Sequence, residues 1–340
     1  MKKNWWKKTV CFLLAGVMAL GLAGCGNGGK KKTSDGLTEM DVVLDWYPNA
    51  IHTFLYDAVE KGYFKEEGIK VKLIPPAESV DALTFVSAGK AQIGLTYPIE
   101  IIKSKVKDNM PVRAIGAVTQ YNLTCLATLE GSGITDDMKT MKGKKIGYDG
   151  TASSEAMIRT VAKSAGLSDD DYEMVNVGFD LTTALTTKSV DMTAGMMLND
   201  EIITMRNEGY KVKTFNYSNY DIPEMYDIVM VANDKDYQKN KKLYDGFLRA
   251  CQKGFKDMKG DEDASLEIIM NKMNSEDNPL DEKQQRQSYE TLIPKMETKD
   301  APFLSMTDKM WQSTIDWMKA TGQIKKTVKT SDIMTAPAQK

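Results

Sequence analysis

The stretch Asp41–Pro76, DVVLDWYPNAIHTFLYDAVEKGYFKEEGIKVKLIPP, decides the fold. Its short apolar start, 41–44, predicts a strand, and the apolar residues of 53–61 recur at helical spacing. The run Ile69–Ile74 alternates apolar residues with Lys and stops at Pro75-Pro76, which predicts a second strand. A strand, a helix and a strand in this order predict parallel strands with the helix packed on their sheet.

The same alternation of strand and helix continues along the chain to residue 232. Further strands are predicted at 91–95, 112–118, 144–148, 172–177, 190–195, 211–215 and 228–232, and the helices between them at 79–87, 98–107, 154–165, 181–187 and 199–207. The remaining pattern is helical, at 235–258, 264–273, 282–292 and 307–320. The sequence therefore predicts an α/β fold with mainly parallel sheets and helices on both faces.

A second strand and helix series starts near Gly143, so we expect two lobes, each with its own core. The chain is expected to cross between them near 121–128 and 223–228, and the last helices return to the first lobe. The expected division is lobe 1 at 39–124 and 226–327, lobe 2 at 125–225 and a tail at 328–340. A ligand would lie between the lobes, where strand ends face helix N-termini.

The first residues are typical of a lipoprotein signal. A basic segment with Lys2, Lys3, Lys7 and Lys8 precedes the apolar stretch 9–22, which is too short for a stable membrane span. Leu22-Ala23-Gly24-Cys25 matches the bacterial lipobox, so we expect a signal peptide at 1–24 and a diacylated Cys25 as the new N-terminus. An ordinary signal peptide with an incidental Cys is the alternative. The polar segment 25–38 would tether the protein to the outer face of the cell membrane.

Composition excludes several classes of function. Without 1–24 the chain has 41 Lys and Arg against 47 Asp and Glu, a formal charge of −6, and no basic run interleaves with aromatic residues. Nucleic-acid binding is therefore not expected. One His and the scattered Cys125 and Cys251 cannot assemble a zinc-type cluster, so we expect neither metal nor cofactor. These two Cys either pair, which the compartment permits, or remain buried thiols.

Several motifs between residues 40 and 230 carry a resemblance to a known family. They are LDWYPNAIH at 44–52, KGYFKEEGI at 61–69, SAGKAQIG at 87–94, GSGI at 131–134, MKGKKIGY at 141–148 and VNVGF at 175–179. Together they resemble the binding proteins for pyrimidine precursors of thiamine that serve ABC importers. The resemblance implies the two-lobed periplasmic-binding-protein type II fold with two interlobe crossovers, in agreement with the pattern above.

The resemblance also implies a function. A monomeric lipoprotein would capture a hydroxymethylpyrimidine or formylaminopyrimidine between its lobes and deliver it to a permease and, through it, to the ATPase. Similar proteins bind riboflavin, sulfonates or nitrate, so the same importer role with another small ligand is the alternative.

The family includes fungal enzymes that build the pyrimidine from their own His and pyridoxal phosphate. These enzymes carry a Lys and a His four residues apart after a Gly-Leu pair, together with a cysteine cluster. Here Gly94-Leu95 is followed by Thr96 and, four residues later, by Glu100. Because an amine is needed to form an imine with the cofactor aldehyde, we do not expect an enzyme.

Aromatic residues near the strand ends are candidates for holding a flat ring. Trp46 and Tyr47 follow the first predicted strand and precede Pro48, in a loop where a heteroaromatic ligand would stack. Tyr97 follows the strand that ends at Leu95 and could close the other side. The structural alternative places Trp46 in the core and Tyr97 in the core or at the surface.

Polar candidates come from both lobes. His52 matches the motif His of the family and would donate a ring N–H into the cleft, although a lone His is commonly structural. Thr151 and Ser153 precede or open a helix and suit an oxygen-rich or anionic group, unless Ser154 merely caps that helix.

Asn199 and Glu201 stand where the family has Asn-x-Glu, and the carboxylate could accept from an exocyclic amine. The preceding Met196-Met197-Leu198 departs from the aromatic residues expected there.

Overall fold

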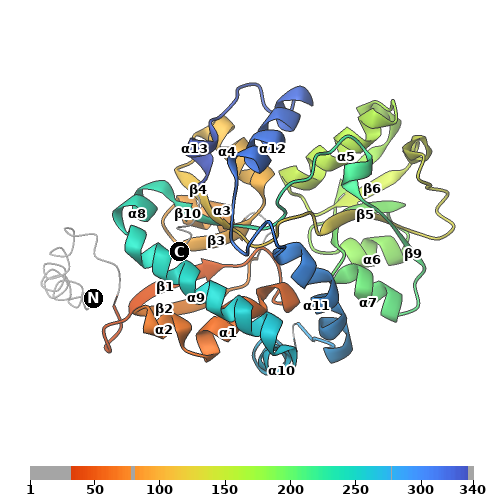
Figure 1. Cartoon of the computed structure of the whole chain (residues 1–340). Helices are drawn as coiled ribbons and strands as arrows, with labels where there is room; N and C mark the ends of the chain where they lie inside the picture. Colours follow the sequence, from red (N-terminus) through yellow and green to blue (C-terminus); the bar gives the residue numbers. More distant parts are fainter. Residues whose placement is uncertain (1–31, 78–80, 277, 336–340) are drawn as a thin grey trace, which may run out of the picture.

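Two five-stranded sheets, each covered by helices, form the two lobes of the computed structural model, which describes residues 32–77, 81–276 and 278–335 (Figure 1). The first sheet has the order β2-β1-β3-β10-β4 and the second the order β7-β6-β8-β5-β9. Their bounds are β1 (Thr38–Val43), β2 (Ile69–Ile74), β3 (Ile93–Thr96), β4 (Val112–Ala117) and β10 (Val229–Asn233), then β5 (Thr124–Leu129), β6 (Lys145–Tyr148), β7 (Glu173–Asn176), β8 (Met192–Met197) and β9 (Val212–Phe215). The predicted signal and the lipid site Cys25 lie outside the described residues.

The first strand–helix–strand unit is as the sequence predicts. β1 pairs with β2 in parallel from Thr38↔Ile69 to Val43↔Ile74, and also with β3 in parallel. Between β1 and β2 the chain forms α1 (Thr53–Glu60) and α2 (Tyr63–Glu66). The second lobe repeats the arrangement, because β6 pairs in parallel with both β7 and β8. The predicted α/β fold is therefore confirmed.

Each sheet contains one antiparallel strand that enters directly from a crossover. β10 lies between β3 and β4, and β5 lies between β8 and β9. Residues 124–128, expected within the first crossover, belong to β5, so the crossover is shorter than predicted. Cys125–Thr128 are all buried, and a strand buried on both faces lacks the alternation that marks a strand in a sequence. The predicted division into segments of two lobes otherwise stays a prediction.

Helices cover both faces of the sheets. Those of the first part of the chain and of lobe 2 are α3 (Asp81–Ser87), α4 (Pro98–Asp108), α5 (Ala152–Ser164), α6 (Leu181–Thr186) and α7 (Glu201–Asn207). The last six are α8 (Asp234–Lys239), α9 (Lys241–Gly260), α10 (Glu262–Lys272), α11 (Glu282–Met296), α12 (Asp308–Ala320) and α13 (Thr330–Ile333). The single helix expected at 235–258 is thus two helices, since the chain breaks at Asn240.

Helix α9 crosses α1 at very short range. A Cβ atom at Gly254 would lie 2.1 Å from the carbonyl oxygen of Phe54 in α1. Because no side chain fits there, Gly254 sets how closely the two helices approach. This contact attaches the helical part of the chain to the first strand–helix–strand unit.

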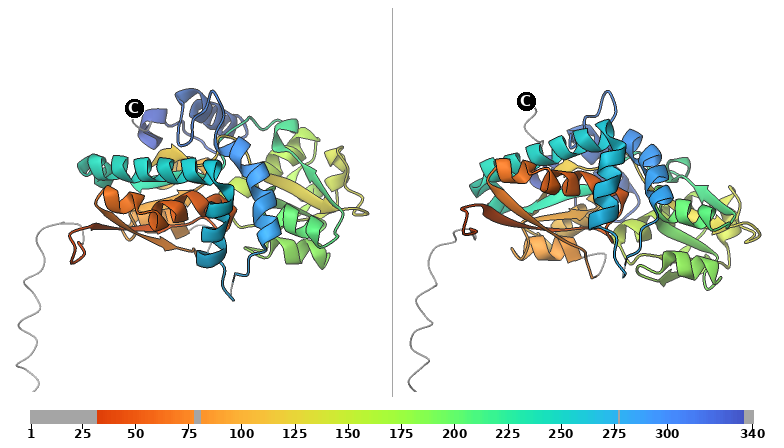
Figure 2. Two further views of the ribbon diagram at one scale, coloured as in Figure 1. Left: turned by 60° about the horizontal axis from the view of Figure 1, so that its bottom comes forward. Right: turned by 90° about the horizontal axis from the view of Figure 1, so that it is seen from below.

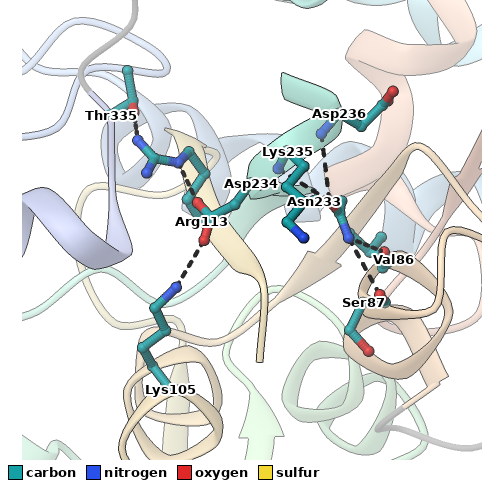
Figure 3. A network of polar contacts seen from close by, with 9 residues as sticks. All are labelled: Val86, Ser87, Lys105, Arg113, Asn233, Asp234, Lys235, Asp236 and Thr335. Carbon is teal, nitrogen blue, oxygen red and sulfur yellow. Dashed lines mark hydrogen bonds and ion pairs between the residues drawn. The ribbon is translucent and has the colours of Figure 1, made fainter. Parts of the chain in front are cut away.

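The last described residues pack on lobe 1, although 328–340 was expected to be a tail. Ile333 in α13 is fully buried, and Met334 forms a parallel bridge with Ala114 of β4. Thr335 accepts from the guanidinium of Arg113 at 2.5 Å (Figure 3). The short apolar group Ile333-Met334 was not recognised because it follows a Lys-rich, polar stretch.

A polar network holds the start of α8 against lobe 1 (Figure 3). The Asp234 carboxylate accepts from Lys105 at 2.7 Å and from Arg113 at 2.5 Å. The neighbouring Asn233 caps α8 with its side-chain oxygen, and its amide donates to the carbonyl of Ser87 at 3.2 Å. One carboxylate therefore joins α4, β4 and the chain that returns through β10.

Among the described residues no helix is long and apolar enough to cross a membrane. Cys125 and Cys251 are both buried and free, one in each lobe, so the disulfide left open by the sequence is not formed.

Candidate ligand-binding site

A narrow cavity lies between the lobes. The centre of a water molecule can occupy a volume of about 20 Å³ there, close to the smallest space that holds one water. The lining residues are Tyr97, Pro98, Ile99, Asn122, Thr124, Asp149, Thr151, Ser153, Ser154, Met157, Tyr217, Met225, Tyr226 and Asp227. They come from lobe 1, from both crossovers and from lobe 2, and none of these described residues is a Lys, Arg or His. In this conformation the lobes are closed on each other.

Two buried carboxylates, Asp149 and Asp227, line this cavity, and the charge of a third, Asp45, acts on the lining residue Tyr97. Asp45 follows β1 and Asp149 follows β6, so each stands at the C-terminal end of the first parallel strand of its lobe. Asp227 lies in the second crossover, and all three residues are at most 5 % exposed. Burial raises the pKa of Tyr97 well above its usual value, and the neighbouring negative charges add to this effect. The carboxylates with this influence are Asp45, Asp149, Asp227 and Glu201.

Asp227 ties the two crossovers together. One of its oxygens accepts from the backbone N–H groups of Leu123 at 2.5 Å and Thr124 at 2.6 Å, and from the Thr124 hydroxyl at 3.0 Å. Burial nevertheless raises the pKa of Asp227, because desolvation outweighs these hydrogen bonds. The carboxylate is thus placed at the joint about which the lobes would move.

The N-terminus of α5 forms one wall of the cavity. Thr151 caps the helix, since its hydroxyl oxygen accepts from the Ser154 N–H at 3.1 Å, and the hydroxyl donates to Asp149 at 2.8 Å. The Ser153 N–H donates to Glu100 of α4 at 2.7 Å. The anionic group that the sequence led us to expect at this helix terminus is therefore a carboxylate of the protein itself.

Trp46 joins the two lobes instead of lying free in a loop. Its ring packs edge-on against Phe179 of lobe 2, with the ring centres 4.3 Å apart, and Tyr47 lies 5.1 Å from the same Phe179 ring. Trp46 is only 8 % exposed and belongs to an apolar cluster that is otherwise formed by residues such as Cys125 and Met196 of lobe 2. Trp46 and Tyr47 border a separate surface groove of about 570 Å³.

His52 has protein partners at both ring nitrogens. Its Nδ1 accepts from the Asn49 N–H at 3.2 Å, so Nε2 carries the proton and donates to Asp45 Oδ1 at 3.1 Å. The ring is fully buried. The expected donation from His52 into the cleft is therefore replaced by donation to Asp45, whose position the ring fixes.

Asn199, Asp200 and Glu201 lie where α7 meets α11, the helix that stands between the lobes (Figures 1 and 2). Asn199 donates to the Ser288 hydroxyl at 3.2 Å, and Gln284 donates to Asp200. Glu201 accepts from the Met197 N–H at 2.9 Å. Burial raises the pKa of Glu201 to about 8, and the charge of Asp200 contributes next.

Several buried oxygens near the interlobe surface have no hydrogen-bond partner. They are Asp45 Oδ2, Asn122 Oδ1 and Asn199 Oδ1, together with the hydroxyls of Ser153 and Tyr217. The two Asn oxygens can only accept hydrogen bonds, and the Asp45 oxygen can only accept when its carboxyl is ionised. Because an unpaired buried acceptor is unfavourable, this arrangement fits a group that brings N–H or O–H donors.

Of the residues proposed from the sequence, Tyr97, Thr151 and Ser153 line the same cavity. Trp46 and Tyr47 meet at Phe179, while Asn199 and Glu201 adjoin α11 and His52 lies behind Asp45. The sequence reasoning missed Asp45, Asp149 and Asp227 as site residues. A carboxylate directly after the first strand of each repeat was the available signal, although such residues also serve as ordinary turn formers. No described residues form a group of three or more ligands that could hold a metal ion.

The strand order, the two crossovers and the interlobe cavity define a protein of the two-lobed periplasmic-binding-protein type. The periplasmic aliphatic sulphonate binding protein of Escherichia coli has this fold, with a TM-score of 0.65, 15% identity and coverage of 86% of this chain and 96% of that one. The chain belongs to the NMT1/THI5-like family, whose model matches residues 49–265.

Two relatives of this chain have different names and different coverage. The formylaminopyrimidine-binding protein of Halalkalibacterium halodurans is 28% identical over 302 residues, which are 89% of this chain and 91% of that protein. The 4-amino-5-hydroxymethyl-2-methylpyrimidine phosphate synthase of Aspergillus parasiticus is 36% identical over 154 residues, which are 45% of this chain and 44% of the synthase.

Proposed function

We propose that this chain is the solute-binding subunit of an ABC importer and that it captures an aminopyrimidine precursor of thiamine between its lobes. It would deliver the ligand to a membrane permease, whose transport is driven by an ATPase. The observation that carries the proposal is the acidic lining of the cavity, which contains the buried carboxylates Asp149 and Asp227 and the unpaired acceptor Asn122 Oδ1, with no cationic side chain among the described lining residues. The similarity to a formylaminopyrimidine-binding protein over most of both chains supports it.

The charge of the site favours an aminopyrimidine over a sulfonate. An exocyclic amine and a hydroxymethyl group supply N–H and O–H donors to acceptors that lack partners. A sulfonate would bring a negative charge next to carboxylates in a poorly solvated space, which is unfavourable. The fold alone, which sulphonate-binding proteins share, does not distinguish the two ligands.

The ring would be held from both lobes. In the proposed arrangement Trp46 provides a stacking face and Glu201 accepts from the amino group, while Tyr97 closes the cavity from lobe 1. Trp46 contacts Phe179 in the closed form. A ligand that stacks on Trp46 would therefore have to enter while the lobes are open and replace part of this aromatic contact. Contacts from both lobes are required, since a ligand that touches one lobe cannot favour closure.

The chain would bind and release its ligand without chemical change. The positions of the Lys and His of the resembling fungal enzymes hold Thr96 and Glu100, and neither can form an imine or serve as a donor imidazole. We further propose that Cys25 carries a lipid anchor. Cys25→Ala should move the protein from the membrane fraction to the medium or periplasm, and retention in membranes would contradict the anchor.

A thermal-shift panel tests the ligand class. The panel contains 4-amino-5-hydroxymethyl-2-methylpyrimidine, its formylaminopyrimidine relative, riboflavin and taurine. A ligand at 100 times its Kd stabilises the protein by about 2.7 kcal/mol, and each kcal/mol raises the Tm by about 2–4 °C in chains somewhat shorter than this one. We expect a shift of several degrees with a pyrimidine only. A shift with taurine or riboflavin alone would overturn the proposed ligand but not the importer role.

A further inference from the structure

We propose that Glu100 is a specificity-determining residue: its carboxylate occupies the N-terminus of α5 and so excludes ligands that carry a phosphate or sulfonate group. The proposal rests on the proposed function in one respect, that the ligand binds between the lobes.

The geometry places a carboxylate of one lobe on a helix of the other. Helix α5 has 13 residues, and the first N–H groups of such a helix have no partner within the helix. The cap Thr151 takes the N–H of Ser154. Glu100, which belongs to α4 of lobe 1, takes the N–H of Ser153 at 2.7 Å. In the closed form the donors that an anionic ligand group would need are therefore engaged by the protein.

A second feature shows that this end of the cavity is built for a polar group. The Ser153 side chain lines the cavity, is 9 % exposed, and its hydroxyl has no hydrogen-bond partner. The hydroxyl can still donate to or accept from a neutral ligand group such as an alcohol. An anion at the same place would also need the backbone N–H of Ser153. That N–H already donates to Glu100, so the anion would be repelled by the Glu100 carboxylate.

Charge around the helix start strengthens the exclusion. Asp149 lies on the other side of Thr151, within 2.8 Å of its hydroxyl, and is itself buried. A phosphate or sulfonate at this end of the cavity would meet the carboxylate of Asp149, which lines the cavity, and would compete with the carboxylate of Glu100 for the Ser153 N–H, and like charges repel strongly where there is little water. A hydroxymethylpyrimidine and its phosphate ester share the same ring, so the site can separate them only through what it does to the added phosphate, and a repulsive charge is one such element. Glu100 provides that charge.

The experiment compares Kd values for 4-amino-5-hydroxymethyl-2-methylpyrimidine and for its phosphate ester by calorimetry at pH 8. The variants are Glu100→Gln, which keeps an acceptor oxygen but removes the charge, and Glu100→Ala, which also frees the Ser153 N–H. Glu155→Gln is the matched control. It removes a charge from the first turn of the same helix, where Glu155 pairs with Arg159 at 3.0 Å, without touching Ser153.

We expect the parent and Glu155→Gln to bind the alcohol and to reject the ester. In Glu100→Gln the ratio of the two Kd values should fall by about tenfold or more, which corresponds to ~1.4 kcal/mol, and in Glu100→Ala by a larger factor. A near-parental melting temperature shows that the variants are folded. An unchanged ratio in both Glu100 variants overturns the proposal.

A separate arm with inorganic sulfate keeps this test independent of the proposed ligand. If the parent binds neither pyrimidine, the proposed function fails, but Glu100→Ala should still be stabilised by millimolar sulfate when the parent and Glu155→Gln are not. Equal sulfate stabilisation of all three proteins overturns the role of Glu100.

Discussion

Replacing Glu201 by Gln should change stability and ligand affinity in opposite directions. The Glu201 carboxylate accepts from the Met197 N–H at 2.9 Å, and burial raises its pKa to about 8. Gln has the same shape and keeps one acceptor oxygen for that N–H. The substitution removes a negative charge that burial disfavours in the ligand-free protein. A ligand amine would donate its hydrogen bond to this same charged group.

The sign of the stability effect follows from the direction of the pKa shift. The pKa of Glu201 is about 8 in the folded protein against 4.5 in a model peptide, so between these values the folded state binds more protons than the unfolded state. The free energy of unfolding therefore falls as pH rises through this window. A full shift of this size corresponds to at most ~5 kcal/mol, and because Glu201 is half-buried and relaxes into water we expect a fall of ~1–2 kcal/mol.

Ligand binding should respond in the other direction. Glu201→Gln loses a charge-assisted hydrogen bond and turns a donor toward the ligand amine, which should weaken binding by about 30- to 1,000-fold, or ~2–4 kcal/mol. At pH 7 the parent should also release a proton on binding, visible as a buffer-dependent heat, whereas the Gln variant should release less.

Urea unfolding at pH 5 and pH 8.5 measures the stability effect, and calorimetric titration measures the affinity. Glu208→Gln, at the exposed C-terminal end of the same helix, is the control and should leave both quantities near the parental values. The reasoning is refuted if Glu201→Gln binds as tightly as the parent, or if it is less stable than the parent at pH 8.5.

Three further outcomes are expected. Gly254→Ala should lower the free energy of unfolding by about 2–3 kcal/mol, because its Cβ would lie 2.1 Å from the Phe54 carbonyl oxygen, and an unchanged urea midpoint would contradict the close helix contact. Trp46→Ala should weaken ligand binding much more than Trp46→Phe. A double-mutant cycle of Trp46→Ala and Phe179→Ala should show a coupling of about 0.5–1.5 kcal/mol in the free energy of unfolding. Asp234→Asn should destabilise the protein by about 1–3 kcal/mol in thermal melts, since two partly buried cations lose their common counter-charge.

The fold could be predicted from local patterns wherever one face of an element is exposed. β2 alternates buried or partly buried apolar residues with exposed Lys residues over Ile69–Leu73 and ends at a Pro pair, so its limits are the predicted ones. β5 has the opposite character, because its central residues are buried on both faces and give no alternation. The break at Asn240 also depends on context, since an Asn in a helical pattern is compatible with a continuous helix.

The site was less predictable because its contacts join distant parts of the chain. Glu100 was notable in the sequence only as a departure from related enzymes, and its partner Ser153 lies 53 residues away in the other lobe. Trp46 was assigned correctly to a loop after a strand, but nothing near it in the sequence indicates that its ring enters the apolar cluster of lobe 2. The orientation of His52 likewise depends on its hydrogen bond with Asp45, and in the sequence Asp45 is equally compatible with an ordinary turn residue.

The two lobes carry their carboxylates in equivalent places, and this has a consequence for closure. Asp45 and Asp149 each follow the first strand of a repeat, so bringing the strand ends together also brings these negative charges toward Tyr97 and toward each other. The hydrogen bonds from α11 to Asn199 and Asp200, just before α7, and the contact of Trp46 with Phe179 favour the closed form, whereas charge repulsion and desolvation oppose it. A ligand rich in N–H donors removes the opposing contribution only when both lobes surround it. Its binding energy is therefore available selectively in the closed state, which is the condition for a ligand to shift the equilibrium between open and closed forms.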